Sequence, residues 1–395
     1  MALALLPAAA AAQLPDHPIG NASGTLAAGA EVSATLSRRD DVAFFNYTDY
    51  DNDALRLVRV RFTGEWRPRT QLSVVGEARS VGRNHFELAA AFVRWRPVAK
   101  WRVDIQAGRI PPVIGAFARR AYGRDNPLVG SPLAYQYLTS LRSDALPDSV
   151  DDLLRMRARG WRPTYPLGSQ ELAPGLPLVA AFHWDTGASA HWSNTWLDVA
   201  AAVTQGSSSY PVVREDNDGK QVSSRIAVSL PVGLSIGVSG ARGNWIEREA
   251  LDHATITPGV SLDQRVAAID AELSRGHLIV RAEALRVTFQ MPTGRAPSFL
   301  SPLVAHSGFI EARYRWRTRW QLAARADRLS FSDVQGTLFG GALTAWDAPV
   351  TRLEGTAGLR VTRTLELRGG YQYNWRDGGR TRRLGFPTVQ LLYWF

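Results

Sequence analysis

Apolar and polar residues alternate in steps of two along most of the chain. From Thr25 to Leu36 every even position is apolar, and the odd positions include Thr25, Glu31 and Ser33. The alternation lasts about a dozen residues, which is longer than the usual strand of a globular sheet. A tilted strand of about ten residues can cross a bilayer. The pattern therefore predicts a membrane-spanning strand with one apolar and one polar face.

The same alternation returns along the chain, and tryptophan marks several of the short basic turns between strands. Such turns follow Trp66, join Trp95 to Trp101, and join Trp316 to Trp320. An indole has an apolar body and a polar N–H, so it favours a membrane boundary. We expect these turns to lie at one boundary. The longer polar segments are expected at the other: 37–53, 206–220, 243–262, 290–305, 330–349 and 375–382.

About 16 such strands can be counted, and no apolar run is long enough for a membrane-spanning helix. The predicted fold is all-β, a transmembrane antiparallel up-and-down β-barrel. An even number of strands places both termini on the periplasmic side. We expect residues 14–395 to form this single barrel, with residues 1–13 as a signal-peptide remnant or an Ala-rich tail. A long segment, 109–177, lacks the alternation and is expected to be a loop.

The last residues carry large apolar side chains on one face of a strand. Val389, Leu391, Tyr393 and Phe395 share this face, and Gln390 lies on the other. The segment resembles the closing strand of the bacterial outer-membrane β-barrel porin superfamily. The resemblance implies a location in the outer membrane of a Gram-negative bacterium. It also implies that Phe395 is a signal for the barrel assembly machinery.

The long loop is rich in proline, and Ser149 to Arg159 within it has the pattern of a short helix. Ser149 can cap this helix, and acidic residues fill its first turn. In general-diffusion porins, which the chain resembles, a long loop folds inward and narrows the pore. A lid over the mouth and a contact with a neighbouring subunit remain alternatives. The candidate constriction residues are Arg109, Arg119, Arg120 and Arg124.

The polar faces of the predicted strands carry many charges of both signs. Charges buried in a dry plug would be costly unless all were paired, so a water-filled lumen is expected. About 16 strands make a barrel wide enough for an aqueous channel. Arginine exceeds acid on these faces, which favours anions, although cross-strand pairs that brace the wall are the alternative. The candidate pore-lining and anion-binding residues are Arg59, Arg61, Arg94, Arg102, Arg281, Arg313, Arg315, Arg325, Arg352, Arg360 and Arg368.

Composition narrows the remaining classes. The chain has a formal charge of +10, no Cys and seven His. On a soluble domain this charge would suggest nucleic acid, but in a barrel it can line a pore, so no nucleic-acid partner is expected. The absence of Cys excludes disulfides and thiol chemistry. The histidines lack metal-ligand spacing and no nucleotide or hydrolase motif is present, so we expect no metal, no cofactor and no enzymatic activity.

Together these features predict a porin for passive diffusion of small hydrophilic solutes, with a preference for anions. The arginine-rich lumen loosely resembles that of phosphate- and anion-selective porins. A homotrimer is implied by resemblance to general-diffusion porins. Expected partners are outer-membrane lipid, lipopolysaccharide and small anionic or neutral solutes. The alternatives are a structural or adhesive barrel plugged by the long loop, and a barrel enzyme such as a lipase or protease.

Overall fold

The structure is a computed structural model of the whole chain. It describes residues 17–19, 24–37, 56–81, 85–98, 101–121, 123–217, 219–253, 262–291, 299, 301–379 and 382–395. The expected signal-peptide remnant, 1–13, lies outside these residues. Among the residues described, no helix is long and apolar enough to cross a membrane.

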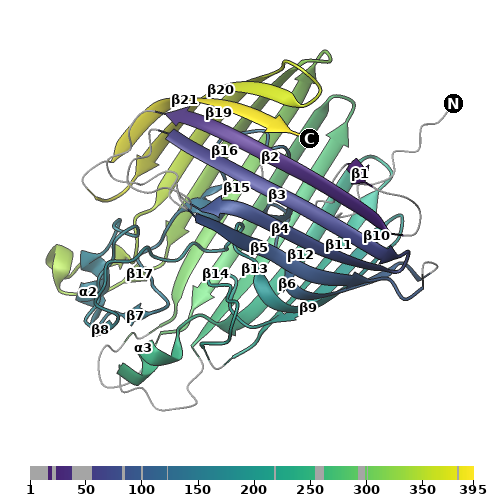
Figure 1. Cartoon of the computed structure of the whole chain (residues 1–395). Coiled ribbons are helices and arrows are strands. Elements are labelled where there is room, and N and C mark those ends of the chain that lie inside the picture. The colour runs from purple at the N-terminus through teal and green to yellow at the C-terminus, as the bar shows by residue number, and fades with distance from the viewer. Residues whose placement is uncertain are drawn as a thin grey trace.

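One antiparallel sheet closes on itself into a barrel (Figure 1). The sheet has 17 strands, and without the short β1 (His17–Ile19) sixteen remain to form the barrel, as the sequence predicted. The barrel closes where β2 pairs with β21, from Glu31 opposite Trp394 to Ser37 opposite Thr388. The sixteen strands are β2 (Thr25–Ser37), β3 (Arg56–Arg69), β4 (Leu72–Val81), β5 (His85–Trp95), β6 (Val103–Ile110), β9 (Asp185–Ser193), β10 (Leu197–Thr204), β11 (Gln221–Leu230), β12 (Leu234–Asn244), β13 (Asp263–Arg275), β14 (Leu278–Phe289), β15 (Leu303–Trp316), β16 (Trp320–Phe331), β19 (Val350–Arg360), β20 (Leu365–Arg376) and β21 (Arg383–Trp394).

The two faces of the strands differ as the alternation predicted. On β3, Val58 and Phe62 are exposed on the outside of the barrel, whereas Arg61 and Glu65 are buried inside it. The closing strand follows the same rule, with Leu391 outside. An apolar exterior on a closed barrel suits a hydrocarbon environment, because every strand has its backbone partners within the sheet.

One strand departs from strict alternation. The ladder between β4 and β5 shifts register between Glu77 and Ala78, where Ala89 is the unpaired residue. Such a bulge places one extra residue on one strand and reverses the faces beyond it. The period-two count puts Ala89 on the outer face, but its side chain is fully buried, and Leu88 is exposed instead.

The tryptophans of the short turns lie together at one end of the barrel. Trp66, Trp95, Trp101, Trp316 and Trp320 are all exposed. Since β2 begins and β21 ends at this same end, it is the periplasmic end of an outer-membrane barrel. The long connections, which hold α3 (Arg248–His253), β17 (Asp333–Val334), η3 (Leu338–Gly341) and β18 (Thr344–Ala345), gather at the opposite, extracellular end (Figure 1).

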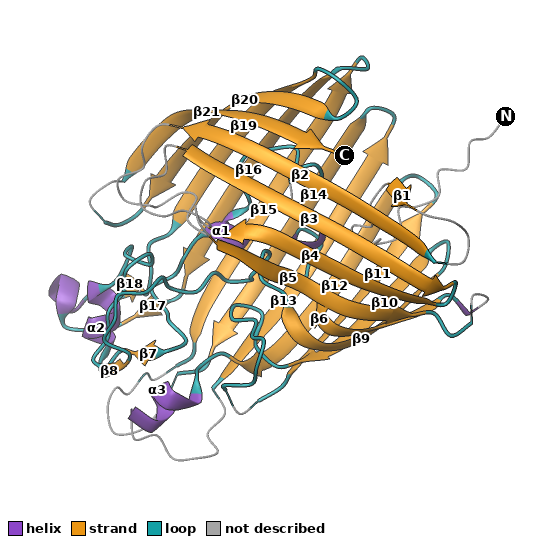
Figure 2. Ribbon diagram, in the orientation of Figure 1, coloured by secondary structure: helices purple, strands orange, loops and turns teal. Residues whose placement is uncertain are grey.

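The longest connection, residues 111–184, folds into the barrel. Its elements are η2 (Ala118–Arg120), α1 (Leu133–Gln136), β7 (Ala145–Leu146), α2 (Val150–Arg155) and β8 (Leu167–Gly168). Figure 2 shows α1 within the barrel, and α1 contacts β15 and β16. The predicted helix is shorter than expected, although Ser149 caps it by accepting the N–H of Asp152. Phe117, Leu133 and Tyr135 of this inward loop are almost fully buried and form a core with wall residues such as Phe309.

Candidate functional site

Carboxylates of the barrel wall hold the backbone of the inward loop. Glu283 on β14 accepts the N–H groups of Ala116 and Phe117 at 2.6 and 3.2 Å, as well as the hydroxyl of Tyr135. Asp327 on β16 accepts the N–H of Leu133 at 2.6 Å. Each carboxylate thus accepts hydrogen bonds from donor groups of the loop that are buried away from water on folding.

Two further carboxylates extend this anchoring around the barrel. Glu354 on β19 accepts the N–H of Gly130 at 2.7 Å. Glu31 on β2 accepts the N–H groups of Gly123 and Arg124 at 3.0 and 3.2 Å. The loop is therefore fixed to the inner wall through its main chain, from β14 to β2.

Asp347, in the extracellular connection after β16, anchors the outer part of the loop. It accepts the N–H groups of Ser140 and Ala158 at 2.7 and 2.9 Å and the hydroxyl of Tyr137 at 3.0 Å. Burial raises the pKa of this carboxyl, and the surrounding donors favour its charged form.

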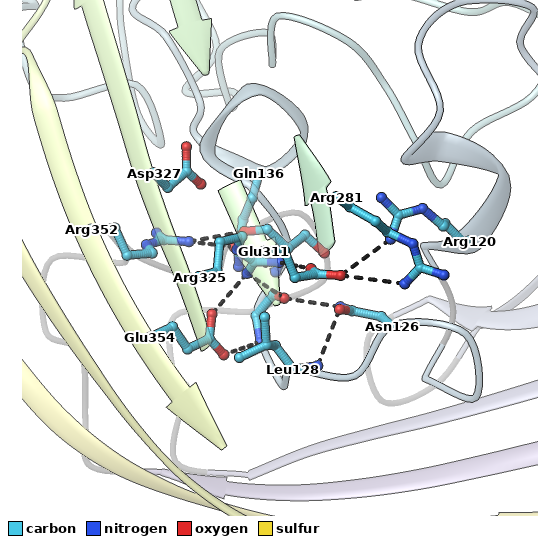
Figure 3. Close-up of polar contacts among 12 residues, drawn as sticks. Arg120, Asn126, Leu128, Gln136, Arg281, Glu311, Arg325, Asp327, Arg352 and Glu354 are labelled. Atoms are coloured by element: carbon cyan, nitrogen blue, oxygen red, sulfur yellow. Dashed lines mark hydrogen bonds and ion pairs between the residues drawn. The ribbon is translucent and has the colours of Figure 1, made fainter. Parts of the chain in front are cut away.

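Arginines of the wall bind the same loop from β16, β19 and β20. Arg325 donates to Glu354 and to the carbonyl of Gly130, at 2.8 and 2.7 Å (Figure 3). Arg352 donates to Gln136 at 2.8 Å, and Arg368 to the carbonyl of Asn126 at 2.8 Å.

These three arginines lie on the inner face, but they do not line open water. Arg325, Arg352 and Arg368 are at most 2% exposed. The reason is that the loop covers them, and their N–H donors are shared between the loop and wall residues such as Asn374 and Glu366. Their pairing with loop carbonyls and wall acids fits the bracing alternative better than an anion-binding one.

A second cluster joins the loop to β14 and β15. Arg120 of η2 and Arg281 of β14 both approach Glu311, at 3.3 and 3.5 Å (Figure 3). The Arg120 guanidinium also lies 5.6 Å from the ring centre of Phe117. Burial, aided by the like charge of Arg281, lowers the pKa of Arg120, and the charge of Glu311 opposes this shift. Arg120 therefore holds η2 against the wall.

The opposite wall, β2 to β4, borders a hollow that the loop does not fill. Its cavity volume is about 30 Å³. The charged groups that line it are Glu31, Arg59, Arg61 and Arg79, and Phe182 lies on the loop side. Arg59 and Arg79 have their guanidinium carbons 5.4 and 5.9 Å from the Phe182 ring centre. Arg61 pairs with Glu77 at 3.1 Å. Two of the predicted pore-lining residues, Arg59 and Arg61, meet here.

The other predicted wall arginines are dispersed. Arg94 is buried on the inner face, where it pairs with Asp104. Arg313 is half-buried on β15, and Arg315 is exposed near the turn. Arg360 is half-buried at the periplasmic end of β19. Arg102 is exposed in the turn before β6 with φ of 54°, so it is not part of the wall.

The candidate constriction residues also separate. Arg119 and Arg120 lie in η2 inside the barrel. Arg124 is exposed and lies 5.9 Å from the ring centre of Trp394. Arg109 is not in the loop: it belongs to β6, on the outward side shared with Ala107, and it donates to the carbonyls of Trp184 and Leu88.

Phe395 takes part in barrel closure. Its N–H donates to the carbonyl of Ala30 at 3.1 Å, and its carbonyl accepts the N–H of Ala30 at 3.2 Å. The side chain is exposed on the outside of the barrel beside Tyr393.

A serine and a histidine meet on β9, which bears on the enzyme alternative. Ser189 Oγ and His191 Nε2 lie 3.3 Å apart, and Asp104 stands opposite His191 in the ladder. However, Ser189 is 4% exposed and faces the lumen, and Asp104 is engaged by Arg94. Within the described part of the chain, no three metal-binding side chains form a group that could hold a metal ion.

The comparisons with known proteins concern the fold. No family model and no curated protein matches the sequence. OmpT of Vibrio cholerae, also solved in a trimer form, matches with a TM-score of 0.56 and 10% identity, over 96% of this chain and 100% of that one. OmpF of Salmonella typhi matches with a TM-score of 0.56 and 12% identity, over 96% and 100%. The anion-selective porin from Comamonas acidovorans matches with a TM-score of 0.56 and 10% identity, over 94% and 100%.

The fold is that of the bacterial outer-membrane porins. This confirms the predicted barrel and its likeness to that group. Together with the apolar exterior, the fold places the chain in the outer membrane.

Proposed function

We propose that this porin-like barrel is a passive diffusion channel for small hydrophilic solutes and that it prefers anions. The observation that carries the proposal is the hollow beside β2, β3 and β4, where three guanidinium groups face one carboxylate, that of Glu31. Solutes pass between this wall and the inward loop. The proposal assigns no enzymatic activity to the chain.

The electrostatics of the hollow support the anion preference. A surplus of guanidinium charge in a confined pore attracts anions, and its paired N–H donors suit phosphate and carboxylate. Glu77 and Glu87 form ion pairs with Arg61 and Arg79, so with Glu31 three carboxylates balance the three guanidinium groups. The anion preference therefore rests on position, because the three arginines line the hollow and Glu77 and Glu87 do not. The Arg59 guanidinium also lies near the Phe182 ring, which holds it beside the hollow.

Planar-bilayer recordings in a salt gradient test the proposal. The wild type should form channels whose reversal potential indicates anion preference. Replacing both Arg59 and Arg61 by Gln should lower the anion-to-cation permeability ratio at least about twofold. The matched control is Arg328→Gln, which removes a cation from the outer face of β16 and should leave selectivity unchanged. Channels whose selectivity is the same in the double variant and the wild type contradict the anion preference.

A plugged structural or adhesive barrel is the second candidate. It is favoured by the burial of Arg325, Arg352 and Arg368 beneath the loop. Under this alternative, folded wild-type protein in the bilayer gives no channels at all. That outcome would contradict the diffusion proposal.

We also propose that the chain forms a homotrimer. The support is the match to OmpT of Vibrio cholerae, a structure of which is described as a trimer form. Native mass spectrometry of the protein extracted in mild detergent checks this, and a monomer mass alone contradicts it.

A further inference from the structure

Four arginines and a histidine lie on the outer, lipid-facing side of five consecutive strands. Arg242 (β12), Arg265 (β13), Arg286 (β14), His306 (β15) and Arg328 (β16) are all exposed. They occupy the same face as the apolar residues Ile236, Ile269 and Ile310. We call these five residues the cationic arc. None of them faces the lumen, so the diffusion proposal does not use them.

The arc is level around the barrel. Arg242, Arg286 and Arg328 each stand eight residues after the first residue of their strands, Leu234, Leu278 and Trp320. Arg265 and His306 each stand ten residues before the last residues of β13 and β15. Neighbours meet across the ladder, since Arg242 lies opposite Arg265 and Arg286 opposite His306. The arc crosses five strands, a width of roughly 20 Å.

The height of the arc is that of the outer membrane boundary. Eight residues of a strand rise about 27 Å along its axis, or roughly 20 Å across a bilayer at the tilt of such barrels. The apolar band of a barrel is about 25 Å tall. Charge on the lipid-facing side is costly at the mid-plane and cheap near the boundary. Since the short turns are periplasmic, the arc lies in the outer leaflet, at the level of lipid headgroups.

The charge of the arc is only partly balanced. Asp263 is the acid among the described outward-facing positions of these five strands, and it pairs with Arg242 at 2.5 Å and approaches Arg265 to 3.7 Å. The side chains of these two arginines nevertheless remain 64% and 53% exposed. Arg328 donates to the hydroxyl of Thr351. Arg286 forms no ion pair with any residue that the structure describes. Four guanidinium groups against one carboxylate leave a positive surplus.

A groove lies directly beneath the arc on the same outer surface. It is shallow and open, spans β13 to β19, has a volume of about 550 Å³, and reaches up to Arg328 and Thr351. The groove exists because small outward-facing residues occupy its floor: Ala271, Ala282, Ala284, Gly308 and Ala326. The exposed residues Ile269 and Ile310 also line it, and Ile310 stands between Ala282 and Ala326 across the ladders. An apolar groove below a row of cations matches a lipid with an acyl chain below an anionic headgroup.

We propose that the cationic arc and this groove form a binding site for a phosphorylated glycolipid of the outer leaflet, that is, lipopolysaccharide. The guanidinium groups of Arg286 and Arg328 bind the phosphates of its lipid part through paired N–H donors. One acyl chain lies in the groove over Ala284 and Gly308. Arg109, on the outer side of β6, does not provide an equivalent site, since its guanidinium is engaged by two backbone carbonyls.

Retention of lipopolysaccharide by the purified barrel tests the proposal. Protein extracted from outer membranes in mild detergent should carry the lipid in native mass spectra. After delipidation it should rebind purified lipopolysaccharide. The double variant Arg286→Gln/Arg328→Gln should bind about tenfold more weakly. The matched control is Arg275→Gln, which removes a cation from the same outer face at the periplasmic end of β13 and should bind like the wild type.

Two further sets of measurements distinguish binding of the headgroup from binding of the acyl chain, and binding of the lipid from binding of free phosphate. Lipopolysaccharide stripped of its phosphates should bind about as weakly to the wild type as the intact lipid binds to the double variant. Gly308→Leu should fill the groove and weaken binding, because a Cβ there has only ordinary contacts with Glu283 and Ala284, so the barrel still folds. Inorganic phosphate at equal concentration should not displace the lipid.

The outcomes are decisive and independent of channel function. Equal binding by the wild type and the folded double variant overturns the proposal, and so does equal binding of dephosphorylated lipid. Displacement by inorganic phosphate would reduce the arc to a simple phosphate site. Folding of each variant is checked by the faster migration of unheated barrels in gel electrophoresis. Bilayer conductance of the double variant should be unchanged, so failure here leaves the proposed channel untouched.

Discussion

Arg325 on β16 and Glu354 on β19 form a buried ion pair, with 2.8 Å between Nη2 and Oε2 and neither side chain more than 3% exposed. The same two residues hold Gly130 of the inward loop, one by its carbonyl and the other by its N–H. The pair thus joins two strands of the wall and the loop in one contact. Its loss should affect both stability and the position of the loop.

Replacing Arg325 by Leu should destabilise the barrel by about 3–5 kcal/mol, because Glu354 and Glu311 remain buried without this partner. The loop should also come loose, with larger and noisier bilayer conductance and new proteolysis near Gly130. Urea unfolding in detergent measures the first effect. Arg328→Leu, three residues later on the outer face, is the control and should give wild-type loop behaviour. Identical unfolding of both variants would contradict this role of the pair.

The backbone of the loop is tightly packed at Gly160. A Cβ at this position would overlap the carbonyl oxygens of Leu138 and Thr139. Gly160→Ala should therefore cost about 1–3 kcal/mol through overpacking. Gly64→Ala is a suitable control, since a Cβ there meets nothing within 4 Å. It should leave stability unchanged or raise it slightly.

Acid should loosen the contact between α2 and the extracellular connection after β16. The carboxylate of Asp151 accepts the hydroxyl and the N–H of Thr337, at 2.6 and 2.8 Å, and the N–H of Leu338 at 3.1 Å. These hydrogen bonds, chiefly that of the Thr337 hydroxyl, hold the pKa of Asp151 below its usual value of 3.8. A lowered pKa gives stability that is fully present above pH 3.8 and is lost as the pH falls through the folded-state pKa.

Hydrogen exchange at the amides of Thr337 and Leu338 checks this dependence. After correction for intrinsic rates, protection should fall between about pH 4 and pH 2. Asp151→Asn should show weaker protection at pH 7 and little further change in acid. Protection that stays constant from pH 7 to pH 2 in the wild type would rule out the carboxylate as the cause.

Deletion of Phe395 should impair barrel closure. It removes both backbone hydrogen bonds to Ala30 and the ring beside Tyr393. We expect a lower folded fraction after refolding into detergent, measured by the migration of unheated samples. Phe395→Leu keeps the backbone bonds and should refold better than the deletion. Equal yields of the deletion and the wild type would show that the last residue is dispensable for closure.

The period-two pattern was enough to predict the fold, since each strand shows one face to lipid and the other to the interior. The pattern predicted the wrong face for Ala89, because the extra residue of a β-bulge has no signature in the sequence. Arg109 continues the outward series of Ala107, so its position could have been read from the sequence. The outward placement of Arg286 and Arg328 follows from the same count.

The partners of the inner arginines could not be predicted in this way. Whether Arg352 meets water or Gln136 depends on where the loop folds, and no local pattern encodes that long-range contact. Arg59 and Arg352 both lie on the polar face of a strand and carry the same charge. The loop nevertheless buries Arg352 completely and Arg59 only in part. The sequence therefore predicted only that the candidate site lies on the inner face of the wall. The structure divides that face into a part covered by the inward loop and the hollow beside β2, β3 and β4.

The wall holds the inward segment partly through peptide N–H groups, which any residue except proline supplies, and the acceptors are Glu31, Glu283, Asp327 and Glu354 of the wall. Side chains of the segment that make none of its anchoring contacts can then be exchanged without moving the backbone that carries them. In the proposed channel, substitutions at such positions would change which solutes pass while the path of the anchored backbone stays the same.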